Sequence, residues 1–173
     1  MIPVNKPLFS GNESKYLLNC IKSGWISSNG KYVKKFEKKF ANYIGRKFST
    51  SVSNGSVALE IALKALNLKS GSEVILPTFT IISCCNSIIK AGLKPVLVDC
   101  DRDTFNMNID HVKNKINKNT SAILMVHIYG ITVDVDKILQ LAKKNKLKVI
   151  EDAAEMHGQK YKKKLCGSFG DIS

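Results

Sequence analysis

The fold class is decided by the stretch Ala122-Ile123-Leu124-Met125-Val126, an uninterrupted run of apolar residues. A strand covered on only one face alternates apolar and polar residues, whereas a strand of a parallel sheet is buried on both faces and lacks that alternation. The stretch Pro95-Val96-Leu97-Val98, which is followed by Asp99, has the same fully buried character. We therefore predict that both stretches are strands of a parallel sheet.

Outward from these two stretches, short apolar runs alternate with amphipathic segments. The predicted strands lie at 48–52, 73–76, 95–99, 122–126 and 147–151. The predicted helices lie at 13–23, 31–44, 57–66, 80–91, 109–116 and 135–145, and a surface hairpin is expected at 159–166. This alternation predicts an α/β fold, a mostly parallel sheet with helices on both faces.

Length and charge exclude several other classes of protein. The 173 residues suffice for one domain with a hydrophobic core, and no segment approaches the ~20 continuous apolar residues of a membrane span. The net charge is +13, but only Arg46 and Arg102 among the 27 basic residues are arginines, and the lysines are scattered. A nucleic-acid-binding surface usually gathers arginine and aromatic residues on one face. With no signal-peptide-like apolar core at the start, we expect a cytoplasmic protein that binds neither nucleic acid nor membrane.

The thiols and imidazoles give no metal-ligand pattern. They belong to Cys20, Cys84, Cys85, Cys100, Cys166, His111, His127 and His157. The cysteines form no C-x-x-C pair, and the histidines lack metal-ligand spacing to them. We expect free thiols, no metal site, and Cys84 and Cys85 as small buried residues of an apolar helix.

Candidate site residues follow four of the predicted strands, because ligands of parallel α/β sheets bind at the carboxyl ends of the strands. These segments are Asn54-Gly55-Ser56, Pro77-Thr78-Phe79-Thr80, His127-Ile128-Tyr129-Gly130 and Asp152-Ala153-Ala154-Glu155.

Each candidate has a functional and a structural interpretation. Gly55 and Ser56 at a helix start suit a phosphate, but the segment is also an ordinary helix cap. Asp152 could pair with a protonated ring nitrogen, or serve as a cap or in a structural salt bridge. For His127 we favour a structural role, and for Phe79 core packing is the more common use.

Taken together, these segments resemble the DegT/StrS family of sugar aminotransferases, which depend on pyridoxal 5′-phosphate and have fold type I. The motifs that carry the resemblance are Gly24-Trp25-Ile26-Ser27-Ser28, Ser53-Asn54-Gly55-Ser56-Val57-Ala58-Leu59, Pro77-Thr78-Phe79-Thr80, Pro95-Val96-Leu97-Val98-Asp99, His127-Ile128-Tyr129-Gly130, Glu151-Asp152-Ala153-Ala154-Glu155 and Gly167-Ser168-Phe169-Gly170-Asp171. The last three, in this order and spacing, are specific.

The resemblance implies a cofactor-binding role for several residues. Gly55 and Ser56 would hold the phosphate of pyridoxal phosphate, and Asp152 would pair with its pyridinium nitrogen. Glu155 would lie near the phenolic oxygen, where the family often has glutamine. Thr80 is expected at the same site.

One position departs from the family's pattern. Ile81 stands where the family usually has an aromatic residue over the cofactor ring. Ring stacking is therefore expected to be weaker, or to be supplied by Phe79.

The resemblance also concerns the chain's extent. Residues 1–173 are expected to be the N-terminal, large, cofactor-binding domain portion, without the small C-terminal domain. In the family, Gly170-Asp171 precedes a Phe-Ser-Phe stretch and then the lysine that forms the Schiff base, so this lysine is expected beyond Ser173. No catalytic residue is therefore assigned within the chain, and the chain alone is expected to be inactive.

The implied reaction transfers an amino group from glutamate to a nucleotide-linked 4-keto-6-deoxy sugar, with GDP-4-keto-6-deoxymannose as the expected acceptor. A homodimer is expected for the complete protein. Two alternatives stay open: a truncated, non-catalytic fragment of such an enzyme, and a related sugar 3-dehydratase in which histidine replaces the lysine.

Overall fold

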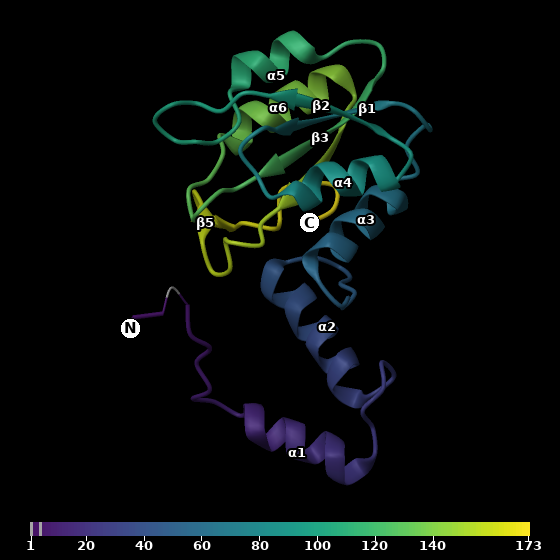
Figure 1. Ribbon diagram of the computed structural model, residues 1–173, viewed down its shortest axis with the longest axis vertical. Helices are drawn as coiled ribbons and strands as arrows, with labels where there is room; N and C mark the ends of the chain where they lie inside the picture. The colour runs from purple at the N-terminus through teal and green to yellow at the C-terminus, as the bar shows by residue number, and fades with distance from the viewer. Residues whose placement is uncertain (1, 4) are drawn as a thin grey trace. The chain divides into compact units, whose positions relative to one another are not determined.

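The computed structural model describes residues 2–3 and 5–173, which separate into two compact units. The first unit extends to Ser51 and contains α1 (Glu13–Ser23) and α2 (Lys31–Ile44), both with the predicted bounds (Figure 1). Each helix ends at a glycine with left-handed backbone, Gly24 with φ 70° and Gly45 with φ 79°. A residue with a side chain adopts this conformation at a cost, which explains why glycine ends both helices.

The strand predicted at 48–52 is wrong, because this segment has no regular secondary structure. Its polar groups bond to α2 instead of to a neighbouring strand. The Ser49 hydroxyl donates to the Glu37 carbonyl at 2.6 Å, and the Ser51 N–H and hydroxyl donate to the Glu37 carboxylate at 2.8 and 3.0 Å. The Ser51 N–H in particular lowers the pKa of Glu37.

The second unit, from Val52 to Ser173, contains a parallel sheet of four strands. They are β1 (Glu73–Pro77), β2 (Lys94–Val98), β3 (Thr120–Val126) and β4 (Lys148–Asp152), in the order β2-β1-β3-β4. Every pair of neighbours runs parallel, which confirms the predicted α/β class.

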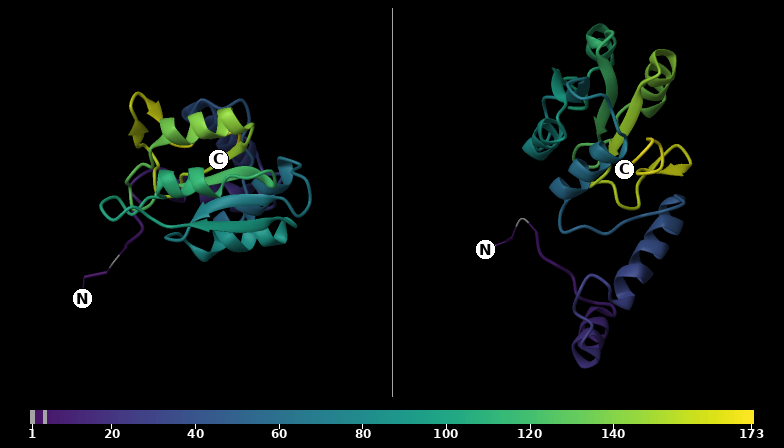
Figure 2. Two further views of the ribbon diagram at one scale, coloured as in Figure 1. Left: turned by 90° about the horizontal axis from the view of Figure 1, so that it is seen from above. Right: turned by 90° about the vertical axis from the view of Figure 1, so that its right-hand side faces the viewer.

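Helices cover both faces of this sheet (Figure 2, left). One face packs against α3 (Gly55–Ala65) and α4 (Ile82–Lys90), and the other against α5 (Ile109–Lys115) and α6 (Val135–Asn145). Successive strand residues alternate between the two cores: Leu124 lies in the core under α3 and α4, and Ile123 in the core under α5 and α6. The apolar runs in the sequence arise because both faces are buried.

One strand is less buried than predicted. In β3 the side chains from Ala122 to Met125 are 0% exposed, but in β2 Leu97 is 51% exposed. Among the described residues β2 pairs only with β1, so it is an edge strand. An apolar run thus identified the strand and not its position in the sheet.

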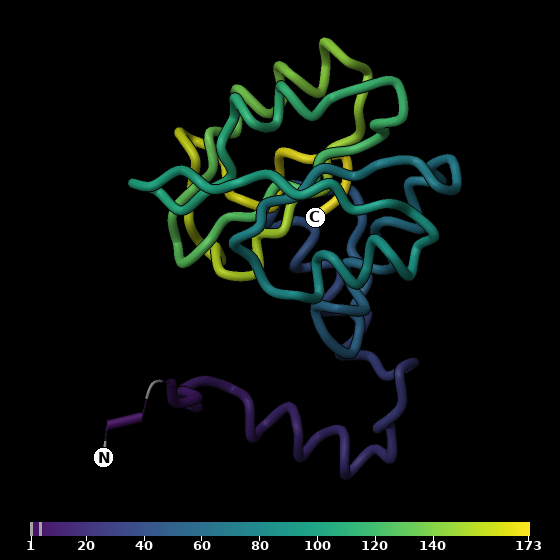
Figure 3. The backbone as a smooth tube through the Cα atoms, turned by 45° about the horizontal axis from the view of Figure 1, so that its top comes forward, coloured from purple at the N-terminus to yellow at the C-terminus, as the bar shows by residue number. Residues whose placement is uncertain are grey.

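The end of the chain returns to the sheet (Figure 3). A short antiparallel hairpin, β5 (Lys160–Tyr161) and β6 (Lys164–Leu165), lies within the predicted range 159–166. After it, Ile172 forms a parallel bridge with Ile150 of β4. No helix in the described part of the chain has the length and apolar character needed to cross a membrane.

Candidate functional site

The candidate site is assembled in the second unit at the carboxyl ends of β1, β3 and β4, beside the first turns of α3 and α4. Thr80 follows β1, Tyr129 follows β3, and Asp152 is the last residue of β4. Gly55 and Ser56 are the first residues of α3. Ligands of parallel sheets bind at this edge.

The first turn of α3 keeps donors available to a ligand. Asn54 caps the helix, because its side-chain oxygen accepts from the Val57 N–H at 3.0 Å. The N–H groups of Gly55 and Ser56 lie ahead of the intrahelical ladder. A Cβ placed on Gly55 would meet no atom within 4 Å, so packing within the protein does not require glycine here. This open approach to the backbone fits a phosphate.

Two residues of α4 that we did not predict contact Ser56. The hydroxyls of Ser56 and Ser83 are 2.7 Å apart, and the Ser87 hydroxyl donates to the Ser56 carbonyl at 3.2 Å. Ser83 therefore adds a second hydroxyl beside the predicted phosphate position. The available signal was a serine in the first turn of a helix predicted to begin at the same sheet edge.

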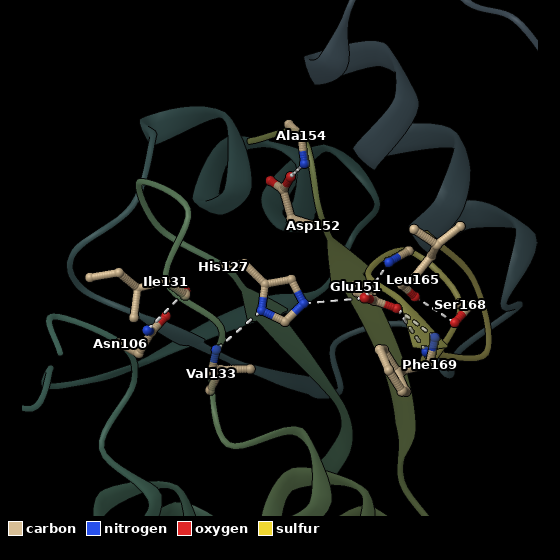
Figure 4. Close-up of polar contacts among 12 residues, drawn as sticks. Asn106, His127, Ile131, Val133, Glu151, Asp152, Ala154, Leu165, Ser168 and Phe169 are labelled. Atoms are coloured by element: carbon tan, nitrogen blue, oxygen red, sulfur yellow. Dashed lines mark hydrogen bonds and ion pairs between the residues drawn. The ribbon is translucent and has the colours of Figure 1, made fainter. Parts of the chain in front are cut away.

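Asp152 receives a donor on each carboxylate oxygen. The Cys84 thiol lies 3.4 Å from Oδ2. The Ala154 N–H donates to Oδ1 at 3.2 Å, as Figure 4 shows. None of the ion pairs among the described residues includes Asp152, so the alternative of a structural salt bridge has no support. A half-buried carboxylate without a cationic partner suits a cationic ligand.

Glu155 connects two of the strand-end segments. Its Oε2 accepts from the Tyr129 N–H at 2.6 Å, across 26 positions of the sequence. Tyr129 has a positive φ of 48°, a backbone conformation that is uncommon for a residue with a side chain. One carboxylate oxygen of Glu155 thus holds the turn after β3, and its contact with the cofactor stays a prediction.

The two residues considered for ring stacking differ in environment. Ile81 precedes α4 and is 62% exposed. The Phe79 ring lies 5.7 Å from Phe105 and 6.0 Å from Tyr129, measured between centroids. Phe79 therefore belongs to an aromatic cluster of its own, and stacking by either residue stays a prediction.

His127 has the structural role that we favoured. It is 1% exposed, and its Nδ1 accepts from the Val133 N–H at 3.2 Å. The ring proton therefore lies on Nε2, which donates to Glu151 Oε1 at 3.2 Å (Figure 4).

Glu151 anchors the loop that contains the last of the family motifs. Besides His127, its carboxylate accepts from the N–H groups of Gly167, Phe169 and Gly170. Burial alone would raise the pKa of Glu151, but these four donors together lower it below its ordinary value. The sequence did not reveal this role, because the donors lie 16 to 24 positions away.

The last two residues of the motif, Gly170 and Asp171, fit tightly against β4. A Cβ on Gly170 would lie 2.7 Å from the Val149 carbonyl oxygen and 2.9 Å from the Ile172 carbonyl oxygen, so only glycine fits. The Asp171 carboxylate accepts from Lys148 Nζ at 2.7 Å and from the Val149 N–H at 2.9 Å. These contacts hold the end of the motif beside β4.

One group of potential metal ligands, His127, Glu151 and Cys166, has its ligand atoms within 4.8 Å of one another. Hydrogen bonds account for this cluster. Both ring nitrogens of His127 are engaged, and both Glu151 oxygens accept from N–H donors. We therefore assign no metal to it.

A comparison with protein families matches residues 8–173 to the DegT/DnrJ/EryC1/StrS aminotransferase family. The match spans most of the chain, so the chain belongs to this family. The resemblance inferred from the sequence motifs is confirmed.

Two curated relatives are similar over essentially the whole chain. The GDP-perosamine synthase of Escherichia coli O157:H7 is 48% identical over 172 residues, which cover 99% of this chain and 47% of the relative. The GDP-perosamine synthase of Vibrio cholerae is 45% identical over 173 residues, covering 100% and 47%. The chain thus spans about half the length of the curated relatives it matches.

Solved structures share the fold. An aminotransferase from Psychrobacter cryohalolentis superposes with a TM-score of 0.89 at 34% identity, covering 95% of this chain and 42% of that one. The GDP-4-keto-6-deoxy-D-mannose-3-dehydratase of E. coli, with bound hydrated pyridoxal phosphate, gives 0.90 at 28% identity, covering 97% and 44%. The fold is therefore that of fold type I enzymes, and pyridoxal phosphate is the cofactor of this family, as the motifs implied.

Proposed function

We propose that this chain supplies the cofactor-binding part of a sugar aminotransferase that acts in the cytoplasm. The reaction would transfer an amino group from glutamate to GDP-4-keto-6-deoxymannose and give GDP-perosamine, a precursor for polysaccharides such as O-antigen. The similarity to two GDP-perosamine synthases over essentially the whole chain supports this substrate.

The observation that carries the proposal is the arrangement of two separate groups at one sheet edge. Hydrogen-bond donors for a phosphate lie at Gly55 and Ser56, and Asp152 offers a carboxylate that has no cationic partner among the described residues. The helix α4 contacts both, through Ser83 and through Cys84. A ligand with a phosphate at one end and a cationic ring nitrogen at the other matches this pair.

Pyridoxal phosphate supplies an electron sink and carries the amino group between the two substrates. The N–H groups of Gly55 and Ser56 would hold its phosphate, together with the hydroxyls of Ser56 and Ser83. Asp152 would keep the proton on the ring nitrogen, since an anion beside a cationic group favours the charged form.

Three further positions complete the proposed site. Thr80 would support it through Cys84, its contact at 3.2 Å. Glu155 would lie beside the phenolic oxygen, and Ile81 beside the ring, where it offers apolar contact without aromatic stacking.

We assign the Schiff-base role to none of the lysines among residues 1–173. The family motif places this lysine after Gly170-Asp171, and the matched relatives are about twice as long as this chain. We propose that the full-length protein provides it in the segment that follows the motif.

The experiment that tests the function uses the full-length protein with pyridoxal phosphate, glutamate and GDP-4-keto-6-deoxymannose. We expect GDP-perosamine as the product, identified by mass spectrometry and NMR. Asp152→Asn should lower kcat/KM by at least about 100-fold, because the carboxylate acts on the reacting ring. The matched control is Asp136→Asn, a carboxylate of α6 that pairs with Lys162 and belongs to the helix layer on the face of the sheet opposite α3 and α4.

Two results would contradict the proposal. A 3-deoxy sugar without a new amine would show the dehydratase reaction, which the E. coli structure with bound hydrated pyridoxal phosphate makes the second candidate. We favour amination because the synthases are 48% and 45% identical to the chain, against 28% for that dehydratase. No turnover of any nucleotide-linked keto sugar by the full-length protein would favour a non-catalytic role.

A further inference from the structure

A cysteine that the sequence suggests only as a core residue contacts the proposed cofactor site. Cys84 lies in α4 and is 0% exposed. Its Sγ lies 3.4 Å from Asp152 Oδ2 on β4 and 3.2 Å from the Thr80 hydroxyl, which follows β1. The sulfur atom of α4 thus contacts both β4 and the loop after β1.

We propose that Cys84 is a positioning residue for Asp152: its thiol donates to Oδ2 and, with the Ala154 N–H on Oδ1, fixes the carboxylate for the ring nitrogen of the cofactor. The inference rests on the proposed function of Asp152. It assigns a role to a side chain that is not itself expected to touch the cofactor.

The direction of the two contacts follows from the chemistry of the groups. An ionised carboxylate only accepts hydrogen bonds, so the thiol must be the donor toward Asp152. Burial, with a further contribution from the nearby Asp152, raises the pKa of Cys84 to about 12, so the thiol keeps its proton at neutral pH. The sulfur then accepts from the Thr80 hydroxyl, and the order of donation runs from Thr80 through Cys84 to Asp152.

A thiol suits this position because it is a weak donor. It restricts the orientation of the carboxylate while leaving most of its negative charge to a cationic partner. Asp152 has no ion pair among the described residues, so no other side chain competes for that charge.

Cys84 also belongs to the hydrophobic core between the sheet and the helices α3 and α4. A role in packing alone and a role as hydrogen-bond donor predict opposite orders of cofactor affinity for two small replacements of Cys84. Serine keeps a donor, whereas alanine keeps the apolar character and loses the donor. If packing alone mattered, alanine would be at least as good as serine, because a hydroxyl is costly in an apolar core.

The test is a titration of the cofactor-free, full-length protein with pyridoxal phosphate, followed by absorbance. We expect Cys84→Ser to bind within about twofold of the unchanged protein, and Cys84→Ala to bind about two- to tenfold more weakly, the effect of one hydrogen bond. Cys85→Ala is the matched control, since this neighbouring half-buried cysteine packs against the same core, and it should bind as the unchanged protein does. An affinity for the alanine variant equal to or above that of the serine variant would overturn the inference.

A second readout does not need the cofactor. The S–H stretching band of Cys84, assigned by its loss in Cys84→Ala, should shift in the infrared spectrum when Asp152→Asn or Thr80→Val is introduced. An unshifted band in both variants would overturn the proposed contacts. If the unchanged protein binds no pyridoxal phosphate at all, the proposed function fails, whereas the infrared result still decides whether the thiol bonds to Asp152.

Discussion

Glu151 and Asp152 are neighbours at the end of β4, yet their carboxylates have different surroundings. Successive side chains of a strand point to opposite faces. Glu151 is 1% exposed and accepts from four donors, whereas Asp152 is half-buried with one donor on each oxygen. The Glu151 carboxylate, with four donors, holds a loop. The Asp152 carboxylate, with two donors, can still accept hydrogen bonds from a ligand.

Glu151→Gln should destabilise the full-length protein by roughly 2–4 kcal/mol in chemical denaturation. The amide would turn N–H groups toward backbone N–H donors that now bond to a carboxylate. Glu60→Gln, at an ion pair with Lys64, should leave stability nearly unchanged, because solvent screens this pair. Equal losses of stability in the two variants would contradict the role of Glu151 in holding this loop.

The pH dependence of this difference has a definite sign. The pKa of Glu151 is lower in the folded protein than its ordinary value of 4.5, so its contribution is fully present above that value and is lost as the pH falls through the folded-state pKa. Denaturation curves of the unchanged protein and Glu151→Gln should therefore converge below about pH 4.5. A constant difference from pH 7 down to the acid limit of folding would count against it.

At the scale of elements, an amphipathic pattern followed by a glycine was sufficient to predict the bounds of α1 and α2. An amphipathic pattern alone was sufficient to predict those of α6 (Val135–Asn145). Local signals failed where the partner of a segment decides its structure. The segment 48–52 bonds to Glu37 of α2, and β2 lies at an edge, and neither fact is encoded in the segment itself.

Two glycines that carry family motifs should respond differently to alanine. Gly170→Ala should destabilise the protein by about 1–3 kcal/mol, because the added Cβ meets backbone carbonyl oxygens that cannot move independently. Gly55→Ala should fold at least as well as the unchanged protein, since its Cβ enters open space at a helix start.

For Gly55→Ala we expect the loss in cofactor affinity instead. The methyl group would occupy the space through which a phosphate approaches the backbone. Titration with pyridoxal phosphate and thermal melting of both variants measure the two effects. A stable Gly170→Ala variant, or unchanged cofactor affinity in Gly55→Ala, would contradict these assignments.

At the scale of the whole molecule, the sequence indicated the sheet edge at which the candidate site lies, but not all the residues that contact one another there. Strand-end motifs placed Gly55, Ser56 and Asp152 at one edge because parallel strands share their carboxyl ends. Ser83 and Cys84 were missed as site residues, since their contacts depend on how α4 is rotated against α3 and β4. The contact between Cys84 and Asp152 joins residues 68 positions apart.

Assembly is the next expectation at this scale. We predict that the full-length protein is a homodimer in solution, as the family resemblance implies. The first unit has apolar side chains to cover, since Leu17 and Ile21 of α1 are 64% and 61% exposed. Light scattering after size-exclusion chromatography should give twice the chain mass, and a monomer at all micromolar concentrations would contradict the prediction.

The most direct measurement is a crystal structure of the full-length protein with pyridoxal phosphate bound. We predict the phosphate at the N–H groups of Gly55 and Ser56, within reach of the Ser83 hydroxyl, and the ring nitrogen at hydrogen-bond distance from Asp152. A cofactor bound elsewhere, or one whose ring nitrogen faces away from Asp152, would contradict it.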